Sequence, residues 1–178
     1  TQDEVIREIA SPGSVNYKKL IELIPSVPVS NYAFINNGDL KFENKTNFLG
    51  LYKPSFSNGS AYGDLDNDGD YDLVVNNVNM KAFIYKNNTE KLYPENRFLK
   101  INLIGKDQNL NAIGSKVYAY SDKNLYTLEQ MPIRGFQSTV DNNLIIGVGN
   151  NEVLDSVLVK WYDGSISKIR NIKSSQTI

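Results

Sequence analysis

Apolar residues near the start of the chain recur at helical spacing in two short runs within residues 2–24. Ser14 is positioned to cap the second run, and Pro25 and Pro28 end it. The apolar positions of the two runs are Val5, Ile6, Ile9, Tyr17, Leu20, Ile21 and Ile24. The pattern predicts an N-terminal helical segment, residues 1–30, in which two short helices pack on a sheet.

From Asn31 onward the pattern changes to short β-type runs that are separated by turn residues. The predicted strands are Tyr32–Ile35, Leu40–Asn44, Asp72–Asn76 and Ala82–Tyr85. Asn37-Gly38, between the first two, is a typical hairpin signal. We therefore predict a four-stranded, propeller-type blade over residues 31–90, with a polar linker at 87–96.

The C-terminal part of the chain carries strands at short, even intervals. They are predicted at Phe98–Ile104, Ser115–Ser121, Leu125–Met131, Leu144–Val148, Val153–Trp161 and Ser165–Ile169. Val157, Val159 and Trp161 alternate as one core face, and Asp163-Gly164 forms the last turn. The pattern predicts an antiparallel β-sandwich over residues 97–178, and for the whole chain an all-β fold class with a short helical start.

Composition narrows the function classes. The chain has 178 residues, a formal net charge of −1, and neither histidine nor cysteine. The balanced charge without a basic stripe argues against a nucleic-acid partner. No apolar run approaches the roughly 18 residues of a membrane span. Nucleophile arrangements that pair serine or cysteine with histidine are excluded, so we assign no catalytic residue.

The strongest chemical signal is a run of alternating carboxylates that contains no lysine or arginine. Its members are Asp64, Asp66, Asp68, Asp70 and Asp72. Counted from Asp64, the aspartates fall at the odd positions that supply calcium ligands in looping chains, and Gly69 takes the sixth position, where the chain turns sharply. Zinc and copper would prefer histidine or cysteine. The run predicts a Ca²⁺ site formed by all five residues, with Asp70 contributing its carbonyl. A solvated polar turn is the alternative.

The loop is not an EF-hand, because Val75 stands where that motif has its bidentate glutamate. It resembles instead the FG-GAP (VCBS-type) calcium repeat of integrin α-subunit propellers and many bacterial surface proteins. The matching positions are Phe56, Ala61, Gly63, the five aspartates, Leu73 and Val75. The family's Phe-Gly pair is Phe56-Ser57 here, and its Gly-Ala-Pro is Asn76-Asn77-Val78. The resemblance implies a propeller blade whose neighbours lie upstream of this sequence.

Four motifs in the C-terminal part resemble, in their order, the ASPIC/UnbV domain, which follows FG-GAP repeats in cartilage acidic protein and bacterial relatives. They are Ala112-Ile113-Gly114-Ser115-Lys116-Val117, Arg134-Gly135-Phe136-Gln137-Ser138, Gly147-Val148-Gly149 and Trp161-Tyr162-Asp163-Gly164. The family more often has Trp-Pro-Asp-Gly, and a His-Phe pair where this chain has Ile145-Ile146.

Together the two resemblances imply a non-enzymatic, calcium-stabilised interaction or adhesion segment of a larger exported bacterial protein. Its location would be extracellular, at the cell surface or in the periplasm. A carbohydrate-binding module is the alternative, with Tyr118, Tyr120 and Tyr126 as an aromatic stripe. A second alternative is an accessory domain of a glycan-processing enzyme.

The expected partners are the upstream blades of the parent chain, with a glycan or a surface protein as a further partner. A single blade buries only part of its apolar surface, because each repeat of an array relies on its neighbours. The residues expected to form a partly uncovered face are Phe34, Leu40, Phe42, Val74 and Phe83.

Overall fold

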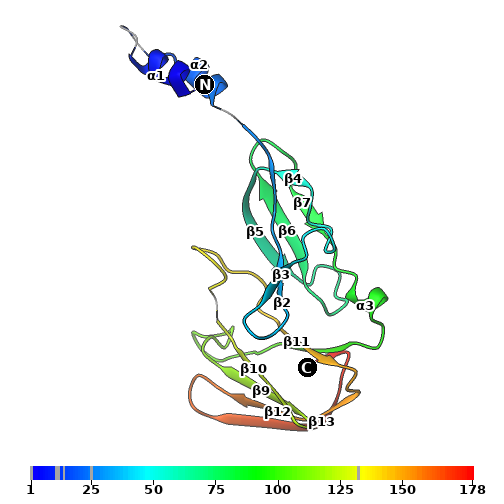
Figure 1. Ribbon diagram of the computed structural model, residues 1–178. Helices are drawn as coiled ribbons and strands as arrows, with labels where there is room; N and C mark the ends of the chain where they lie inside the picture. The colour runs from blue at the N-terminus through cyan, green and yellow to red at the C-terminus, as the bar shows by residue number, and fades with distance from the viewer. Residues whose placement is uncertain (1, 11–12, 14, 25, 132) are drawn as a thin grey trace. The chain divides into compact units, whose positions relative to one another are not determined.

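A computed structural model describes residues 2–10, 13, 15–24, 26–131 and 133–178. Its elements confirm the all-β fold class with a short helical N-terminal segment (Figure 1). The chain divides into two compact units, residues 1–58 with 77–81 and residues 59–76 with 82–178. Within the described ranges, no helix has the length and apolar character needed to cross a membrane.

The first unit begins with two short helices, neither of which contains a buried residue. They are α1 (Gln2–Ala10) and α2 (Tyr17–Leu23). Asn16 caps α2, because its side chain accepts a hydrogen bond from the Lys19 N–H at 3.2 Å. Ser14 and Pro25, predicted as the cap and the end of this helix, lie outside the described residues. Neither helix has a buried residue, which packing against a sheet would have produced.

The strands of the first unit are short and form two antiparallel ribbons. β1 (Val29–Ser30) pairs with β4 (Pro54–Ser55), and β2 (Phe34–Asn36) pairs with β3 (Phe42–Asn44). The predicted hairpin is present, but its turn is wider than Asn-Gly, because the Asn37 N–H donates to the Lys41 carbonyl. Leu40 was predicted inside a strand and instead lies in this turn, with φ of 59° and 92% of its surface exposed.

A three-stranded sheet has the order β5-β6-β7 and lies mainly in the second unit. Its strands are β5 (Ser57–Gly63), β6 (Asp72–Asn77) and β7 (Phe83–Tyr85). The four strands predicted to form one sheet are therefore divided between this sheet and the β2–β3 ribbon. β5 was not among the four strands predicted from periodicity, because its sequence, Ser-Asn-Gly-Ser-Ala-Tyr-Gly, has no apolar alternation to mark it.

The remaining strands of the second unit form the predicted sandwich, with sheet orders β10-β9-β12-β13 and β11-β8-β14. They are β8 (Arg97–Ile101), β9 (Lys116–Ser121), β10 (Asn124–Glu129), β11 (Leu144–Gly149), β12 (Val153–Lys160), β13 (Ile166–Lys173) and β14 (Gln176–Thr177). The pairings are antiparallel except for β14, which runs parallel to β8.

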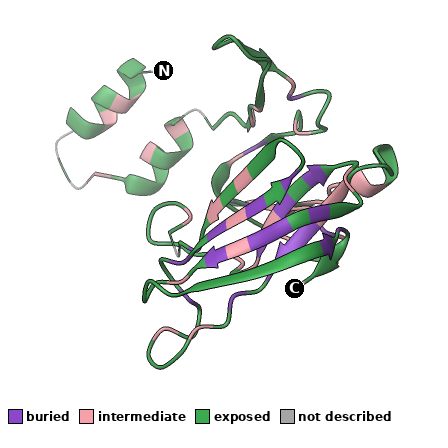
Figure 2. Cartoon of the chain, turned by 90° about the horizontal axis from the view of Figure 1, so that it is seen from below, coloured by how far each residue is buried: buried purple, intermediate pink, exposed green. Residues whose placement is uncertain are grey.

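Both sheets contribute to one hydrophobic core. Buried residues are concentrated on these strands (Figure 2). Leu99 on β8 and Val117 on β9 are fully buried, at 0% exposed surface. Val157 and Val159 are buried and Trp161 packs against the same cluster, which confirms the alternation predicted for this strand. The predicted linker at 87–96 contains a further short helix, α3 (Thr89–Leu92).

Candidate metal centre

The five aspartates lie in the connection between β5 and β6, which we call the Asp loop (residues 64–72). Two of its residues adopt left-handed backbone conformations, Asn67 with φ of 62° and Gly69 with φ of 95°. Glycine and asparagine tolerate this conformation better than other residues. Local sequence therefore lets the chain turn sharply at two positions of a short loop.

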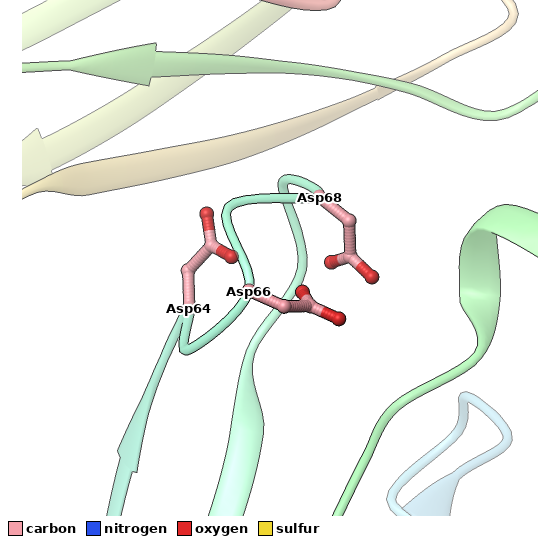
Figure 3. Close-up of side chains that lie close together, drawn as sticks. All are labelled: Asp64, Asp66 and Asp68. Atoms are coloured by element: carbon pink, nitrogen blue, oxygen red, sulfur yellow. The ribbon is translucent and has the colours of Figure 1, made fainter.

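The turns bring carboxylates together in two overlapping groups. One oxygen each from Asp64, Asp66 and Asp68 lie within 4.8 Å of one another, and the same holds for Asp68, Asp70 and Glu90. Figure 3 shows the first group, in which the carboxylates of Asp66 and Asp68 are turned toward each other. Asp68 belongs to both groups. The aspartate that was predicted beside the turn glycine is thus the centre of the cluster.

Several of these oxygens are buried and, among the described residues, have no hydrogen-bond partner. They are Asp64 Oδ1, Asp68 Oδ2, Asp70 Oδ1 and Glu90 Oε2. A buried ionised oxygen without a donor is costly, and a bound cation removes that cost. The donor set consists of carboxylate oxygens alone, which suits a hard cation such as Ca²⁺ or Mg²⁺.

Asp72 has a different environment from the other four aspartates. It is 3% exposed, and its two oxygens accept backbone N–H groups from Leu65 at 3.1 Å and from Asn87 at 2.9 Å. These bonds close the base of the loop and fasten the segment that follows β7. A carboxylate has about four acceptor positions, so Asp72 retains acceptor capacity toward the loop interior.

Two lysines from outside the loop supply the positive charge that the run itself lacks. Lys86 contacts Asp66, and its Nζ lies 3.2 Å from Asp68 Oδ2, close enough for an ion pair although hydrogen-bond geometry is not met. Lys100 Nζ lies 2.9 Å from Asp64 Oδ2 and 3.1 Å from Asn67 Oδ1. The hydrogen bond between Lys86 and Asp66 raises the pKa of Lys86 and lowers the pKa of Asp66.

The lysines do not balance the charge evenly across the cluster. Burial raises the pKa of Asp70 to about 6, and the neighbouring charges of Asp68 and Glu90 add to the shift. Asp70 therefore still experiences excess negative charge. A cavity of about 440 Å³ is lined in part by Asp68, Asp70 and Glu90. The negative charge and the open volume thus lie at the same end of the loop.

Sequence analysis did not identify Glu90, Lys86 or Lys100 as part of this site. The positions of Glu90 and Lys86 could have been inferred from the strands predicted on either side of the turn after β6. β6 and β7 are antiparallel, with Leu73 opposite Tyr85, so the residues just after β7 return to the loop end of β6. Lys100 had no such signal, because its position depends on how the sandwich meets the loop.

Comparison with known proteins gives one family match. Residues 105–178 match the family model described as ASPIC and UnbV, a range that runs from the segment before β9 to the end of the chain. A search of curated proteins found no match. The part of the chain that supplies most of the sandwich is therefore similar to the ASPIC and UnbV family, which confirms that part of the sequence prediction.

Proposed function

We propose that the Asp loop binds a calcium ion and that the chain is a calcium-stabilised, non-enzymatic interaction segment of a larger exported protein. The observation that carries the proposal is the set of buried carboxylate oxygens without hydrogen-bond donors, which meet around Asp68. Among the described residues these oxygens accept no hydrogen bond, and a divalent cation would satisfy several of them at once.

The residues that would hold the ion are Asp64, Asp66, Asp68 and Asp70, with Asp72 at the base of the loop. Glu90 on α3 adds a carboxylate that the spacing of the run did not predict. Calcium accepts roughly 6–8 oxygen ligands in flexible geometry, whereas magnesium demands a near-ideal octahedron. An irregular loop whose donors are carboxylate oxygens therefore favours calcium. The bound ion would supply charge compensation and rigidity.

A non-catalytic role follows from the chemistry of the donors. An ion whose coordination is filled by protein oxygens has little capacity to activate a substrate. The sequence also lacks histidine and cysteine, so the common general bases and nucleophiles are missing. We therefore propose stabilisation and interaction as the function, rather than turnover.

The proposed setting rests on the two family resemblances. The match of residues 105–178 supports an accessory domain that accompanies other domains. The resemblance of the loop to FG-GAP repeats supports neighbouring blades of the parent chain as partners, and an extracellular, cell-surface or periplasmic location. Calcium is abundant outside the cell, and sites in extracellular modules function with dissociation constants of about 10⁻⁴–10⁻³ M.

Calorimetric titration with Ca²⁺ tests the proposal. We expect binding to the wild type and binding at least about tenfold weaker for Asp68→Asn, which removes a charge but keeps the shape of the side chain. Asp107→Asn is the matched control, since Asp107 is an exposed turn residue outside the cluster and asparagine tolerates its φ of 52°. Equal melting temperatures in chelator and in millimolar calcium would refute the proposal.

Carbohydrate binding is a second candidate, because a cavity of about 190 Å³ is lined by two aromatic and several polar side chains. Its lining includes Trp161, Tyr162, Lys106 and Asp163. The predicted tyrosine stripe does not support it: Tyr126 pairs with buried Ala119 and packs on the core, so it lies on the opposite face from Tyr118 and Tyr120. Quenching of Trp161 fluorescence by saccharides tests this candidate.

A further inference from the structure

Lys100 lies in the middle strand of the β11-β8-β14 sheet and faces the Asp loop. Its neighbours along the strand, Leu99 and Ile101, are buried in the sandwich core at 0% and 2% exposed surface. Successive side chains of a strand point to opposite faces. Lys100 therefore points away from the core, and its ammonium group reaches Asp64 Oδ2 at 2.9 Å and Asn67 Oδ1 at 3.1 Å.

This ion pair is enclosed. The side chain of Lys100 is 9% exposed and that of Asp64 is 0% exposed. By contrast, the side chain of Lys86, which contacts Asp66 and Asp68, is 45% exposed. Salt weakens an exposed pair far more than a buried one. The two lysines are thus different: Lys86 is an exposed counter-charge, while Lys100 is a fixed part of the structure around the loop.

Phe98 makes a second contact from the same face of β8. A Cβ atom added to Gly69 would lie 2.1 Å from one carbon of the Phe98 ring and 2.2 and 2.4 Å from two others. The backbone of the loop therefore rests directly on the ring, and only glycine permits this approach. Gly69 is the residue next to Asp68, the centre of the carboxylate cluster. Two points of the Asp loop, Asp64 and Gly69, are therefore in contact with one strand of the sandwich.

Asp64 belongs both to the ion pair with Lys100 and to the carboxylate group that it forms with Asp66 and Asp68. Lys100 occupies Oδ2, while Oδ1 is buried without a hydrogen-bond partner among the described residues. The lysine therefore fixes the orientation of the Asp64 carboxylate, which lies in one group with the carboxylates of Asp66 and Asp68. A ligand oriented by a buried partner loses less freedom on binding, which is how outer partners tune metal sites.

We propose that Lys100 is a positioning residue of the cation site, and that through Lys100 and Phe98 the bound ion stabilises the β-sandwich itself. This inference rests on the proposed function. The Asp loop and strands β8–β14 then unfold as one cooperative unit. Calcium binding to the loop therefore increases the free energy of unfolding of the sandwich. The ion site of this chain is then built jointly by the loop and by a sandwich strand.

Trp161 provides a readout that is separate from the loop. It is the sole tryptophan of the sequence and packs against the sandwich core. Unfolding of the full chain by urea, followed by its fluorescence, therefore reports the sandwich. With free calcium a thousandfold above its dissociation constant, the unfolding constant seen at Trp161 should fall about thousandfold relative to chelator. Calcium binding by calorimetry is measured on the same sample.

The outcomes separate the two proposals. Calorimetric binding with an unchanged unfolding curve at Trp161 would overturn the inference and leave the proposed function intact. A lack of calorimetric binding would remove the proposed function and the inference with it. Binding accompanied by a calcium-dependent shift of the Trp161 curve supports both.

Lys100→Met tests the positioning role, because methionine keeps the apolar stem without the ammonium. We expect the calcium-dependent change in the unfolding constant at Trp161 to shrink by at least about tenfold, and Lys100→Arg to restore part of it. Lys116→Met is the matched control on β9, since Lys116 pairs only loosely, at 3.8 Å, with Glu129. An unchanged calcium response in Lys100→Met would contradict the positioning role.

A second variant covers the case in which Lys100→Met does not fold. Asn67→Gly removes one of the two acceptors of Lys100 and leaves the buried ion pair in place. Glycine accepts the φ of 62° at this position without strain. The calcium response at Trp161 should be reduced in this variant, and a response equal to that of the wild type would count against the inference.

Discussion

The first unit and the sandwich of residues 97–178 both contain many large apolar side chains, yet only the sandwich buries them. The sandwich core includes Leu99, Val117 and Leu154 at 0% exposed surface. In the described residues of the first unit the buried side chains are polar instead: Thr46, Ser55 and Asn77. Each of these makes hydrogen bonds, for example from the Ala33 N–H to Thr46 and from Asn77 to the Lys81 carbonyl.

Comparison of the two regions shows that strand length and strand pairing, rather than the number of apolar residues, decide whether a core forms. The sandwich strand β12 spans 8 residues and pairs on both sides, with β9 and β13. β2 and β3 span 3 residues each and pair only with each other in the described sheets. A strand that short presents at most two side chains on one face, too few to enclose an apolar layer.

Substitution of one large apolar residue in each region should give the largest contrast. Leu99→Ala removes a fully buried side chain from the sandwich core and should lower the free energy of unfolding by about 2–5 kcal/mol. Phe42→Ala, on a side chain that is 62% exposed, should change it by less than about 0.5 kcal/mol. Urea unfolding of the two variants measures both values. Comparable losses would mean that Phe42 is buried in solution.

Removal of calcium should destabilise the Asp loop and the sandwich but not the first unit. The ion stabilises the state that binds it by about 4 kcal/mol when its free concentration is a thousandfold above the dissociation constant. Addition of chelator should therefore speed amide hydrogen exchange in β6 and β8, which adjoin the Asp loop or contact it. Exchange in the β2–β3 ribbon of the first unit should stay the same. Equal acceleration in both regions would show that the ion acts on the whole chain.

The contrast also explains which parts of the fold the sequence predicted. Periodicity marked the sandwich strands because their alternation reflects real burial, as at Val157 and Val159. Periodicity failed where the side chains of an element are not buried, because their sequence then need not alternate between apolar and polar residues. β5 has no periodic signal because it is polar, and Leu40 was assigned to a strand although it lies exposed in a turn. The two-residue strand β14 carries too few positions for any periodic signal.

At the candidate site the sequence predicted the donor residues within the loop but not the residues around the loop. Spacing alone placed Asp64, Asp66 and Asp68 on one cluster, since a short loop fixes its own geometry. Lys100 lies 36 positions from Asp64. A contact at that separation depends on how the sandwich strand meets the loop, and no local pattern encodes it.

Gly69→Ala should have an intermediate effect, about 1–3 kcal/mol in the free energy of unfolding. The added methyl group meets the Phe98 ring and also strains a φ of 95°. Gly38→Ala in the first unit is the matched control: its φ is 87°, and no atom lies within 4 Å of the added Cβ. The control carries the backbone strain without the overlap. Equal melting temperatures for the two variants would show that the ring contact contributes nothing.

The smallest expected effect concerns the apolar surface of the first unit. Phe34, Phe42 and Phe48 are 58%, 62% and 74% exposed. Val74 and Phe83, which the sequence grouped with this face, lie on β6 and β7 in the second unit and are only partly exposed. Of the five residues of the predicted face, the strongly exposed ones are therefore Phe34, Leu40 and Phe42, in and around the β2–β3 ribbon of the first unit.

Large exposed apolar side chains of this kind promote association, because contact between copies removes them from water. We expect weak self-association in sedimentation velocity, visible as a sedimentation coefficient that rises with concentration. Phe34→Ser combined with Phe42→Ser should reduce it, while the same double change has little effect on stability, since neither ring belongs to a core. The ribbon would then be a surface that a neighbouring blade could cover. A species of 20.0 kDa at every concentration, without binding of a hydrophobic dye, would instead show that the first unit is complete by itself.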